Sequence, residues 1–235
     1  IEGLLEERNA HLQELIKKNE EITAQNEEIT GLFNDIRRNY LSTVKALANS
    51  IDANDQYTRG HCERVRNIAI AIAKRLNYSQ IDLNNLEFAS LLHDIGKIGI
   101  PSELLNKKDE LSKDEYEIVK NHPKIASDIL EDVEFLRESR EIIYQHHERI
   151  DGKGYPQQLN AREIALSAKI LAVADAYDAM TSIRSYREVP LTKEEAIQEL
   201  KSAEGSQFDK VVVEAFVNIL NEGEIEIENA SEESA

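Results

Sequence analysis

The chain has 235 residues, 41% of them hydrophobic, and a formal net charge of −17 at pH 7, since 45 Asp and Glu outnumber 28 Lys and Arg. It is long enough to bury the core of one medium domain and to carry an extension, but its charge excludes nucleic-acid polymers and anionic membrane surfaces as expected partners. No apolar run is long enough to span a membrane, and a single cysteine, Cys62, with no secretory leader before it, predicts a cytoplasmic protein without internal disulfides.

Residues 1–50 carry a heptad repeat, which predicts a long coiled-coil helix for signalling or dimerisation. Its a positions are Leu5, Leu12, Asn19, Asn26, Phe33 and Tyr40, and its d positions are Ile1, Arg8, Leu15, Ile22, Ile29 and Ile36. Asn19 and Asn26 favour a parallel homodimer, because two asparagines at a hydrogen-bond only in register. Arg8 and Gly31 weaken the repeat, and the alternative is a single amphipathic helix that packs on its own domain. Such a coil also predicts an upstream sensor or receiver domain.

From residue 51 to 221 the apolar residues recur almost everywhere with helical spacing, which predicts an all-α domain. Helices are expected over residues 65–76, 83–92, 170–180 and 211–220, and Ile142, Ile143, His146 and His147 are expected near the end of another helix. Ser112 followed by Glu115, and Thr192 followed by Glu195, predict two capping boxes. The segment DGKGYP, residues 151–156, has the composition of a turn. The acidic residues 222–235 predict a mobile tail.

Histidines and aspartates at apolar positions are the candidate metal ligands. Apart from His11 in the coil, the histidines are His61, His93, His122, His146 and His147. Asp94 follows the apolar run FASLLH, and Asp175 follows another in KILAVAD; a carboxylate is costly to bury unless it is paired or bound to metal. Imidazole and carboxylate without thiolate suit iron or manganese, with zinc and nickel as alternatives. Each histidine alone has the simpler interpretation of a packed core or surface residue.

Two long motifs, LLHDIGKIGIP at 91–101 and HHERIDGKGYP at 146–156, resemble the HD-GYP family, a branch of the HD-domain metal phosphohydrolases. Shorter segments that resemble family motifs are HCERV at 61–65, HP at 122–123, ADAYDAMTSIRSYR at 174–187 and EGSQFD at 204–209. The resemblance covers about residues 50–220. It implies an HD-type helical bundle that follows the N-terminal coil.

The resemblance also implies a binuclear metal site, with Asp94 bridging the two ions. One ion would be held by His61, His93, Asp94 and Asp175, and the other by His122, His146, His147 and Asp94. Tyr57 stands where some members have a glutamate that binds a third metal, so two metals are expected. The implied catalytic residues are Asp94 and Lys97, and the implied substrate-binding residues are Lys97, Asp178, Arg184, Arg187, Gly154, Tyr155 and Pro156. The alternative roles of Asp178 are an orienting contact to an arginine and a structural salt bridge.

Members of this family open cyclic di-GMP to linear pGpG, and some continue to GMP. The resemblance therefore implies a cyclic di-GMP phosphodiesterase, with diguanylate cyclases or adaptors as further partners. One alternative is hydrolysis of another cyclic dinucleotide such as cyclic GMP-AMP, and a second is a module that binds the dinucleotide or a partner without turnover. Ala126 replaces a frequent glycine, and Ser185 replaces a proline between the final arginines, but neither change removes an expected ligand.

Overall fold

The structure is a computed structural model that describes residues 2–52, 60–107, 109–183 and 189–225. The chain divides into two compact units, Ile1–Thr43 and Val44–Ala235. The division falls inside the first helix, α1 (Glu2–Asp52), and earlier than the boundary expected at residue 50. The all-α class is confirmed, because the described residues form helices, turns and two isolated β-bridges but no strand.

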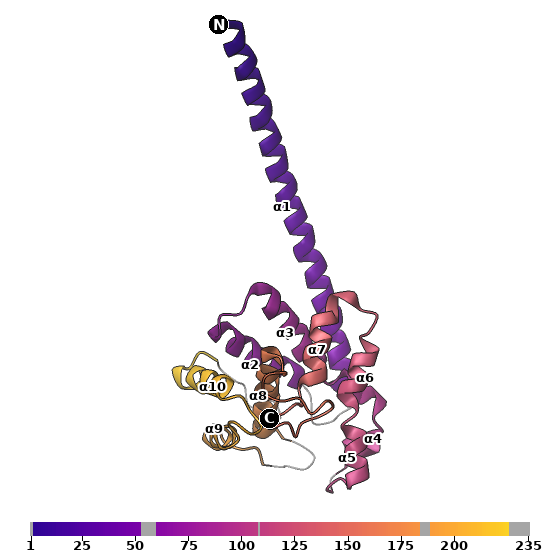
Figure 1. The fold of residues 1–235 in the computed structure, drawn as a ribbon. Coiled ribbons are helices and arrows are strands. Elements are labelled where there is room, and N and C mark those ends of the chain that lie inside the picture. The colour runs from indigo at the N-terminus through magenta and orange to yellow at the C-terminus, as the bar shows by residue number, and fades with distance from the viewer. Residues whose placement is uncertain (1, 53–59, 108, 184–188, 226–235) are drawn as a thin grey trace, which may run out of the picture. The chain divides into compact units, whose positions relative to one another are not determined.

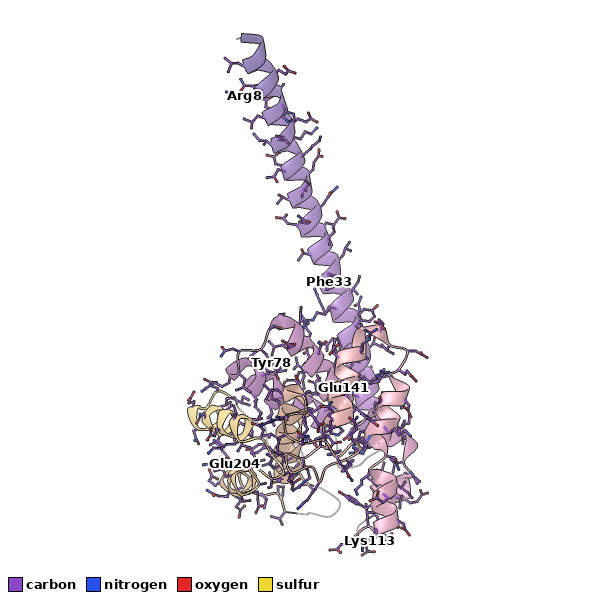
Figure 2. The ribbon with its side chains drawn as sticks, in the orientation of Figure 1. Arg8, Phe33, Tyr78, Lys113, Glu141 and Glu204 are labelled. Atoms are coloured by element: carbon purple, nitrogen blue, oxygen red, sulfur yellow. The ribbon has the colours of Figure 1, made fainter. Side chains whose placement is uncertain are left out.

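The first unit consists of the N-terminal part of α1, which continues without a break through Gly31 (Figure 1). The apolar side chains of the heptad repeat are exposed along it, from 44% at Leu5 to 71% at Phe33. Figure 2 draws the side chains along this helix, with Arg8 and Phe33 labelled. Within this unit the stripe therefore has no partner helix, and the predicted homodimer stays a prediction.

The second unit begins with the last turns of α1, where Val44 and Ala48 are buried. Its other helices in the described residues are α2 (His61–Arg75), α3 (Gln80–Leu92), η1 (Ile95–Gly99), α4 (Ser102–Leu105), α5 (Lys113–Val119), α6 (His122–Ile129), η2 (Glu134–Leu136), α7 (Arg137–Gln145), α8 (Leu166–Thr181), α9 (Lys193–Ser202) and α10 (Lys210–Glu222). The helices expected at 65–76, 83–92, 170–180 and 211–220 correspond to α2, α3, α8 and α10. Ile142 and Ile143 lie near the end of α7 and His146 and His147 directly follow it, as expected for residues near the end of a helix.

The core forms around α8, which contacts α2, α3, α7, α9 and α10 and lies in the middle of the bundle in Figure 1. The sequence of α8 explains this position, since Ile170, Leu171, Val173 and Ala174 are all fully buried and form one broad apolar face. In α2 one face is likewise buried, and the other carries charged residues. The buried helix α8 thus carries Asp175, whose side chain remains 21% exposed, at the centre of the bundle.

Both predicted capping boxes are confirmed. The Ser112 hydroxyl accepts from the backbone N–H of Glu115, whose carboxylate accepts from the backbone N–H of Ser112. Thr192 and Glu195 make the same reciprocal pair at the start of α9. These bonds satisfy backbone donors that the first turn of a helix leaves open.

The acidic C-terminus is tied to the bundle at its beginning. Glu222 is the last residue of α10, which ends at Gly223 in the left-handed conformation. The Arg75 guanidinium donates to Glu222 and, at 2.7 Å, to Glu224. The tail expected from residue 222 therefore starts later than predicted, and residues 226–235 lie outside the described residues. None of the described helices combines the length and the apolar character that crossing a membrane requires.

Candidate metal centre

The expected metal ligands come from five separate elements of the second unit. His61 is the first residue of α2, His93 and Asp94 join α3 to η1, and His122 is the first residue of α6. His146 and His147 directly follow α7, and Asp175 lies within α8. The structure brings these side chains together, with the histidines and Asp94 at or next to helix ends and Asp175 inside α8.

The first group contains His61, His93 and Asp94, whose ligand atoms lie within 4.8 Å of one another. Asp94 Oδ2 lies 3.7 Å from His61 Nε2 and 3.5 Å from His93 Nε2. Asp175 completes the group, because its Oδ1 lies 3.3 Å from His61 Nε2 and 3.8 Å from His93 Nε2. Two imidazole nitrogens thus converge with one oxygen from each of two carboxylates.

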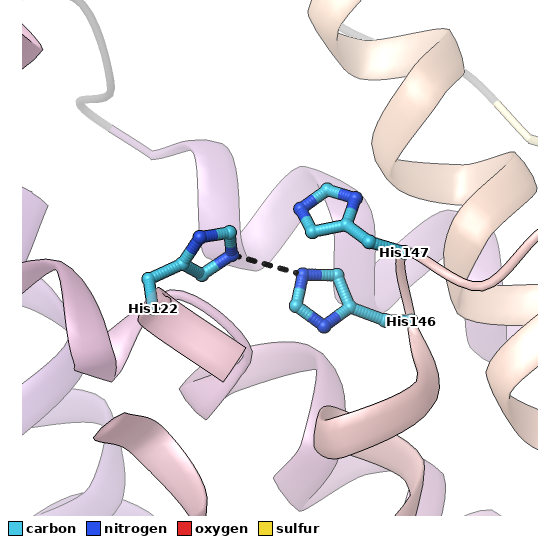
Figure 3. Close-up of side chains that lie close together, drawn as sticks. All are labelled: His122, His146 and His147. Atoms are coloured by element: carbon cyan, nitrogen blue, oxygen red, sulfur yellow. Dashed lines mark hydrogen bonds between the residues drawn. The ribbon is translucent and has the colours of Figure 1, made fainter. Parts of the chain in front are cut away.

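The second group contains His122, His146 and His147 (Figure 3). The dashed line in Figure 3 marks the 3.4 Å approach between His122 Nε2 and His146 Nε2. The Nδ1 atoms of these rings donate to the carbonyls of Val119, at 2.9 Å, and Ile143, at 2.5 Å. In neutral rings both Nε2 atoms then carry lone pairs that face each other, an arrangement that a shared cation stabilises.

Asp94 lies between the two groups. Its Oδ2 faces His61 and His93, while its Oδ1 lies 3.7 Å from His122 Nε2. The Lys97 ammonium donates to Asp94 Oδ2 at 2.6 Å. One carboxylate therefore presents an oxygen to each group, which is the placement that a bridging ligand needs.

Partners on the far side of the rings point the Nε2 atoms into the centre. His93 Nδ1 donates to the Ser90 carbonyl at 2.9 Å, as His122 and His146 do to theirs. His61 differs, because its Nδ1 lies 2.6 Å from Asp178 Oδ2, and a carboxylate can only accept. Such partners fix the tautomer and the orientation of metal-binding imidazoles.

Burial and neighbouring charge favour the ligand forms of these groups. Burial, together with the charge of Lys97, lowers the pKa of His122 to about 4. Burial, together with neighbouring imidazoles, lowers the pKa of His147 to about 3 and lowers that of His146 as well. Burial raises the pKa of Asp94, but Lys97 and the histidines outweigh it, so the pKa falls well below its usual value. The result is neutral imidazoles beside ionised carboxylates, the forms that bind metal.

The metal-free chain is expected to lose stability as the pH falls from about 6.5 towards 4. In that window the unfolded chain takes up a proton on His122, whose pKa is 6.5 when unfolded but about 4 when folded, so protonation favours unfolding. The shift corresponds to a loss on the order of 3 kcal/mol. Urea unfolding of chelator-treated protein, near neutral pH and near pH 4, measures it. A transition midpoint that does not move with pH, or a His122→Asn variant with the same pH dependence, would contradict this assignment.

The donor set fits metal ions. His93 Nε2 is buried and has no hydrogen-bond partner among the described residues, although it points at two carboxylates. A buried polar atom without a partner costs free energy, which a bound cation would recover. The nitrogens of His122 and His146, 3.4 Å apart, can share one ion at bond lengths of about 2 Å.

Gly96 permits the close packing that places His122 opposite Asp94. A Cβ atom at Gly96 would lie 1.9 Å from the His122 carbonyl oxygen and 2.7 Å from the Ala126 backbone nitrogen. The backbone of η1 therefore lies directly against the start of α6. Gly154 acts in the same way, since a Cβ there would lie 2.4 Å from the Arg149 backbone nitrogen.

A cavity of about 550 Å³ opens beside the centre. Its wall includes ligand residues from both groups, namely His146, His147 and Asp175. The cationic residues in its wall are Lys120, Arg149 and Lys153, and the aromatic ones are Tyr116, Tyr155 and Phe208. The Tyr155 ring lies beside the His147 ring, with 4.8 Å between centroids, and Lys120 Nζ lies 5.7 Å from the Tyr155 centroid. The cavity thus places cationic side chains and ring surfaces next to the metal ligands.

The expected substrate-binding residues that the structure describes, other than Lys97, differ from one another in burial and position. Gly154 is buried, and Tyr155 and Pro156, joined by a cis peptide bond, are half-buried. Asp178 is only 1% exposed, contacts His61 and Arg64, and is not among the residues that line this cavity. Arg184 and Arg187 lie outside the described residues, as do Tyr57 and Ser185.

Sequence reasoning missed two charged residues that support the site. The buried Glu148 carboxylate accepts from the backbone N–H groups of Gln157, Gln158 and Leu159 at 2.6–3.1 Å, and so holds the loop that carries Tyr155. Arg64 contacts Asp178. The sequence signal for Arg64 was its position one helical turn after His61. For Glu148 there was no such signal, because no local pattern distinguishes it from a solvated glutamate.

Comparison with known proteins gives one family match. The HD domain family matches residues 45–212. A cyclic di-GMP phosphodiesterase of Thermotoga maritima is 39% identical over 92% of this chain and 58% of its own length. The cyclic di-GMP phosphodiesterase response regulator RpfG of Xanthomonas campestris is 36% identical over 78% of this chain and 49% of its own.

A 3'3'-cGAMP-specific phosphodiesterase of Vibrio cholerae is 32% identical over 86% of this chain and 40% of its own length. The chain therefore spans about half the length of the curated relatives it matches. Among solved structures, an HDG"Y"P protein of Bdellovibrio bacteriovorus is similar with a TM-score of 0.60 and 24% identity, over 80% of this chain and 62% of that one. The similarity to this solved structure concerns the fold alone.

Proposed function

Because the chain belongs to the HD domain family, in its HD-GYP branch, we propose that it is a metal-dependent phosphodiesterase that opens cyclic di-GMP to linear pGpG. The observation that carries the proposal is Asp94, which turns one carboxylate oxygen to each histidine group beside a cation-lined cavity. The relatives named as cyclic di-GMP phosphodiesterases support this substrate.

We assign two divalent cations to the centre. His61, His93 and Asp175 would hold one, the second histidine group would hold the other, and Asp94 would be shared. Imidazole nitrogens with carboxylate oxygens suit iron or manganese, with zinc and nickel as alternatives. When bound, such a pair supplies an acidified water and neutralises charge on the phosphate.

The protein's own residues would bind and orient a doubly charged substrate. A chain with a net charge of −17 repels such a substrate at long range, so local cations must offset that field. Lys97, held at Asp94, lies beside the ligands, while Lys120 and Arg149 line the cavity. Tyr155 offers a ring for stacking with a base, and Gly154 and Pro156 shape its loop.

Two other functions can be distinguished from hydrolysis of cyclic di-GMP by specific measurements. Hydrolysis of a mixed cyclic GMP-AMP is supported by a Vibrio cholerae relative at 32% identity, and the ligand set is the same for both substrates. Arg184 and Arg187, whose guanidinium forks suit phosphate, remain proposed substrate residues. A module that binds the dinucleotide without turnover would retain ligand and release no product.

The deciding experiment is an anaerobic purification with iron or manganese, followed by metal analysis and a substrate panel. The panel contains cyclic di-GMP, cyclic GMP-AMP, cyclic di-AMP and linear pGpG, with products separated by chromatography. We expect two metals per chain and pGpG as the product of cyclic di-GMP, while GMP would mean that the linear product is cut again. Metal-loaded protein that leaves every substrate intact would refute the enzymatic function.

We also propose that α1 pairs two copies of the chain in a parallel coiled coil in the cytoplasm, and that an upstream sensor or receiver domain acts through it. The exposed apolar stripe and the a-position residues Asn19 and Asn26 support parallel pairing. The chain's partial coverage of its relatives is consistent with a further domain. Diguanylate cyclases or adaptor proteins are additional proposed partners.

Replacing Ile22 or Ile29 with aspartate is expected to convert the dimer to a monomer, because both are d positions and a buried charge opposes pairing. Ala24→Asp is the matched control, since residue 24 lies on the outer face of the same heptad. Sedimentation velocity measures the mass. An Asn19→Cys variant should also form a disulfide across a parallel pair, because the native Cys62 is buried and does not compete. A wild-type chain that sediments as a monomer at micromolar concentration would instead favour the single-helix interpretation.

A further inference from the structure

His61 is held differently from the other histidines whose Nδ1 partners are described above. Those rings donate to neutral backbone carbonyls three residues earlier in the chain. His61 donates instead to the carboxylate of Asp178 at 2.6 Å, across 117 residues of sequence. A carboxylate partner makes an imidazole a stronger electron donor to a metal, and it fixes the ring more firmly.

Two aspartates of α8 contact the two nitrogens of this one ring. Asp175 Oδ1 lies 3.3 Å from His61 Nε2, and Asp178 Oδ2 lies 2.6 Å from His61 Nδ1. Residues three apart on a helix share a face, so the two carboxylates lie one turn apart along α8. The position of the Asp178 carboxylate therefore decides where His61 Nε2 points.

Arg64 holds that carboxylate in place. Its Nε donates to Asp178 Oδ1 at 2.6 Å, and its Nη2 lies 3.3 Å from Asp178 Oδ2. The same Nη2 donates to Ser182 Oγ at 3.2 Å. Asp178 is 1% exposed, and a buried carboxylate needs both a cation and hydrogen bonds to remain ionised and ordered.

The start of α2 is built to allow this contact. Arg64 follows His61 by three residues and so lies on the same face of the helix. Gly60, just before the helix, has a φ of +71°, and a Cβ atom there would lie 3.1 Å from Arg64 Nη1. Glycine thus leaves room for the guanidinium beside the first turn.

We propose that Arg64 is a positioning residue of the metal centre, which holds Asp178 so that His61 presents Nε2 to Asp94 and Asp175. The Arg64 side chain bonds to Asp178 and Ser182 and is a member of neither ligand group. It acts through Asp178 on the retention of the ion that His61 would hold. The inference rests on the metal centre of the proposed function.

The test compares Arg64→Ala with Arg64→Lys and with Arg66→Ala. Arg66 is the matched control, since it lies on the same helix and pairs with another buried carboxylate, Glu87, that belongs to neither ligand group. Each protein is loaded with manganese, transferred into chelator and sampled for metal per chain over time. We expect Arg64→Ala to lose one of its two ions at least about tenfold faster than the wild type. Arg64→Lys should be intermediate, because a lysine supplies charge but not a fork, and Arg66→Ala should retain both ions as the wild type does.

Equal retention in Arg64→Ala and the wild type would overturn the proposal, as would equal loss in Arg66→Ala, which would indicate general destabilisation. If Arg64→Ala does not fold, Arg64→Lys decides, and wild-type retention in that variant counts against a role for the guanidinium fork. The outcome is independent of substrate. A wild type that holds two ions but cleaves no cyclic dinucleotide would refute the proposed function and leave the Arg64 comparison valid, whereas a wild type that takes up no metal would refute both.

Discussion

Replacing Asp94 with alanine is expected to lower kcat/KM for cyclic di-GMP by at least about a thousandfold and to remove most of the bound metal. Asp94 is the described residue whose two oxygens face both histidine groups, within 3.5–3.7 Å of His61, His93 and His122. Its loss removes a ligand from both ions at once. It also removes negative charge from the place where two cations would lie closest together, so their mutual repulsion would increase.

The measurement pairs hydrolysis with metal analysis on the same preparations. Asp128→Ala is the control, because Asp128 is an exposed aspartate on α6, the helix that begins with His122, and belongs to neither ligand group. It should keep both activity and metal. Asp94→Asn keeps the shape of the side chain but removes its charge, and we expect it to resemble the alanine variant. Wild-type turnover in either Asp94 variant would show that the assigned centre is not the reaction site.

Replacing Gly96 with alanine is expected to destabilise the second unit by about 1–3 kcal/mol or more and to weaken the metal site at His122. The added methyl group would lie 1.9 Å from the His122 carbonyl oxygen. Backbone atoms cannot rotate away as a flexible side chain can, so η1 and α6 must separate. His122 would then move away from Asp94 Oδ1, which now lies 3.7 Å from its Nε2.

Urea unfolding and metal content measure the two effects of Gly96→Ala separately. Gly31→Ala is the matched control, because a Cβ at Gly31 meets nothing within 4 Å and the residue lies inside α1. Alanine favours a helix over glycine by about 1 kcal/mol, so the control should not lose stability. Because Gly31 belongs to the first unit and the metal ligands to the second, the control should also keep full metal content and activity. Equal stability and metal content in Gly96→Ala and the wild type would mean that η1 and α6 are not packed as described.

Local patterns predicted the helical elements well, because they depend on neighbours within a few residues. The apolar spacing of 65–76 predicted α2, and Val65, Ile68 and Ile72 are all fully buried. The capping boxes at Ser112 and Thr192 depend on residues three apart, and both form. The start of the tail was predicted too early, because the contact of Glu224 with Arg75 joins residues 149 apart and leaves no local trace.

The sequence by itself determined the all-helical class, the coil repeat and, through ordered motifs, which residue types are candidate ligands. Only the tertiary structure decided which atoms meet. It placed the two oxygens of Asp94 towards different histidine groups, set Asp178 behind His61 and brought Arg64 and Glu148 into support. The physical reason is that helix spacing orients a side chain relative to its own helix, whereas the approach of α2, α6, α7 and α8 depends on packing between residues far apart in the chain.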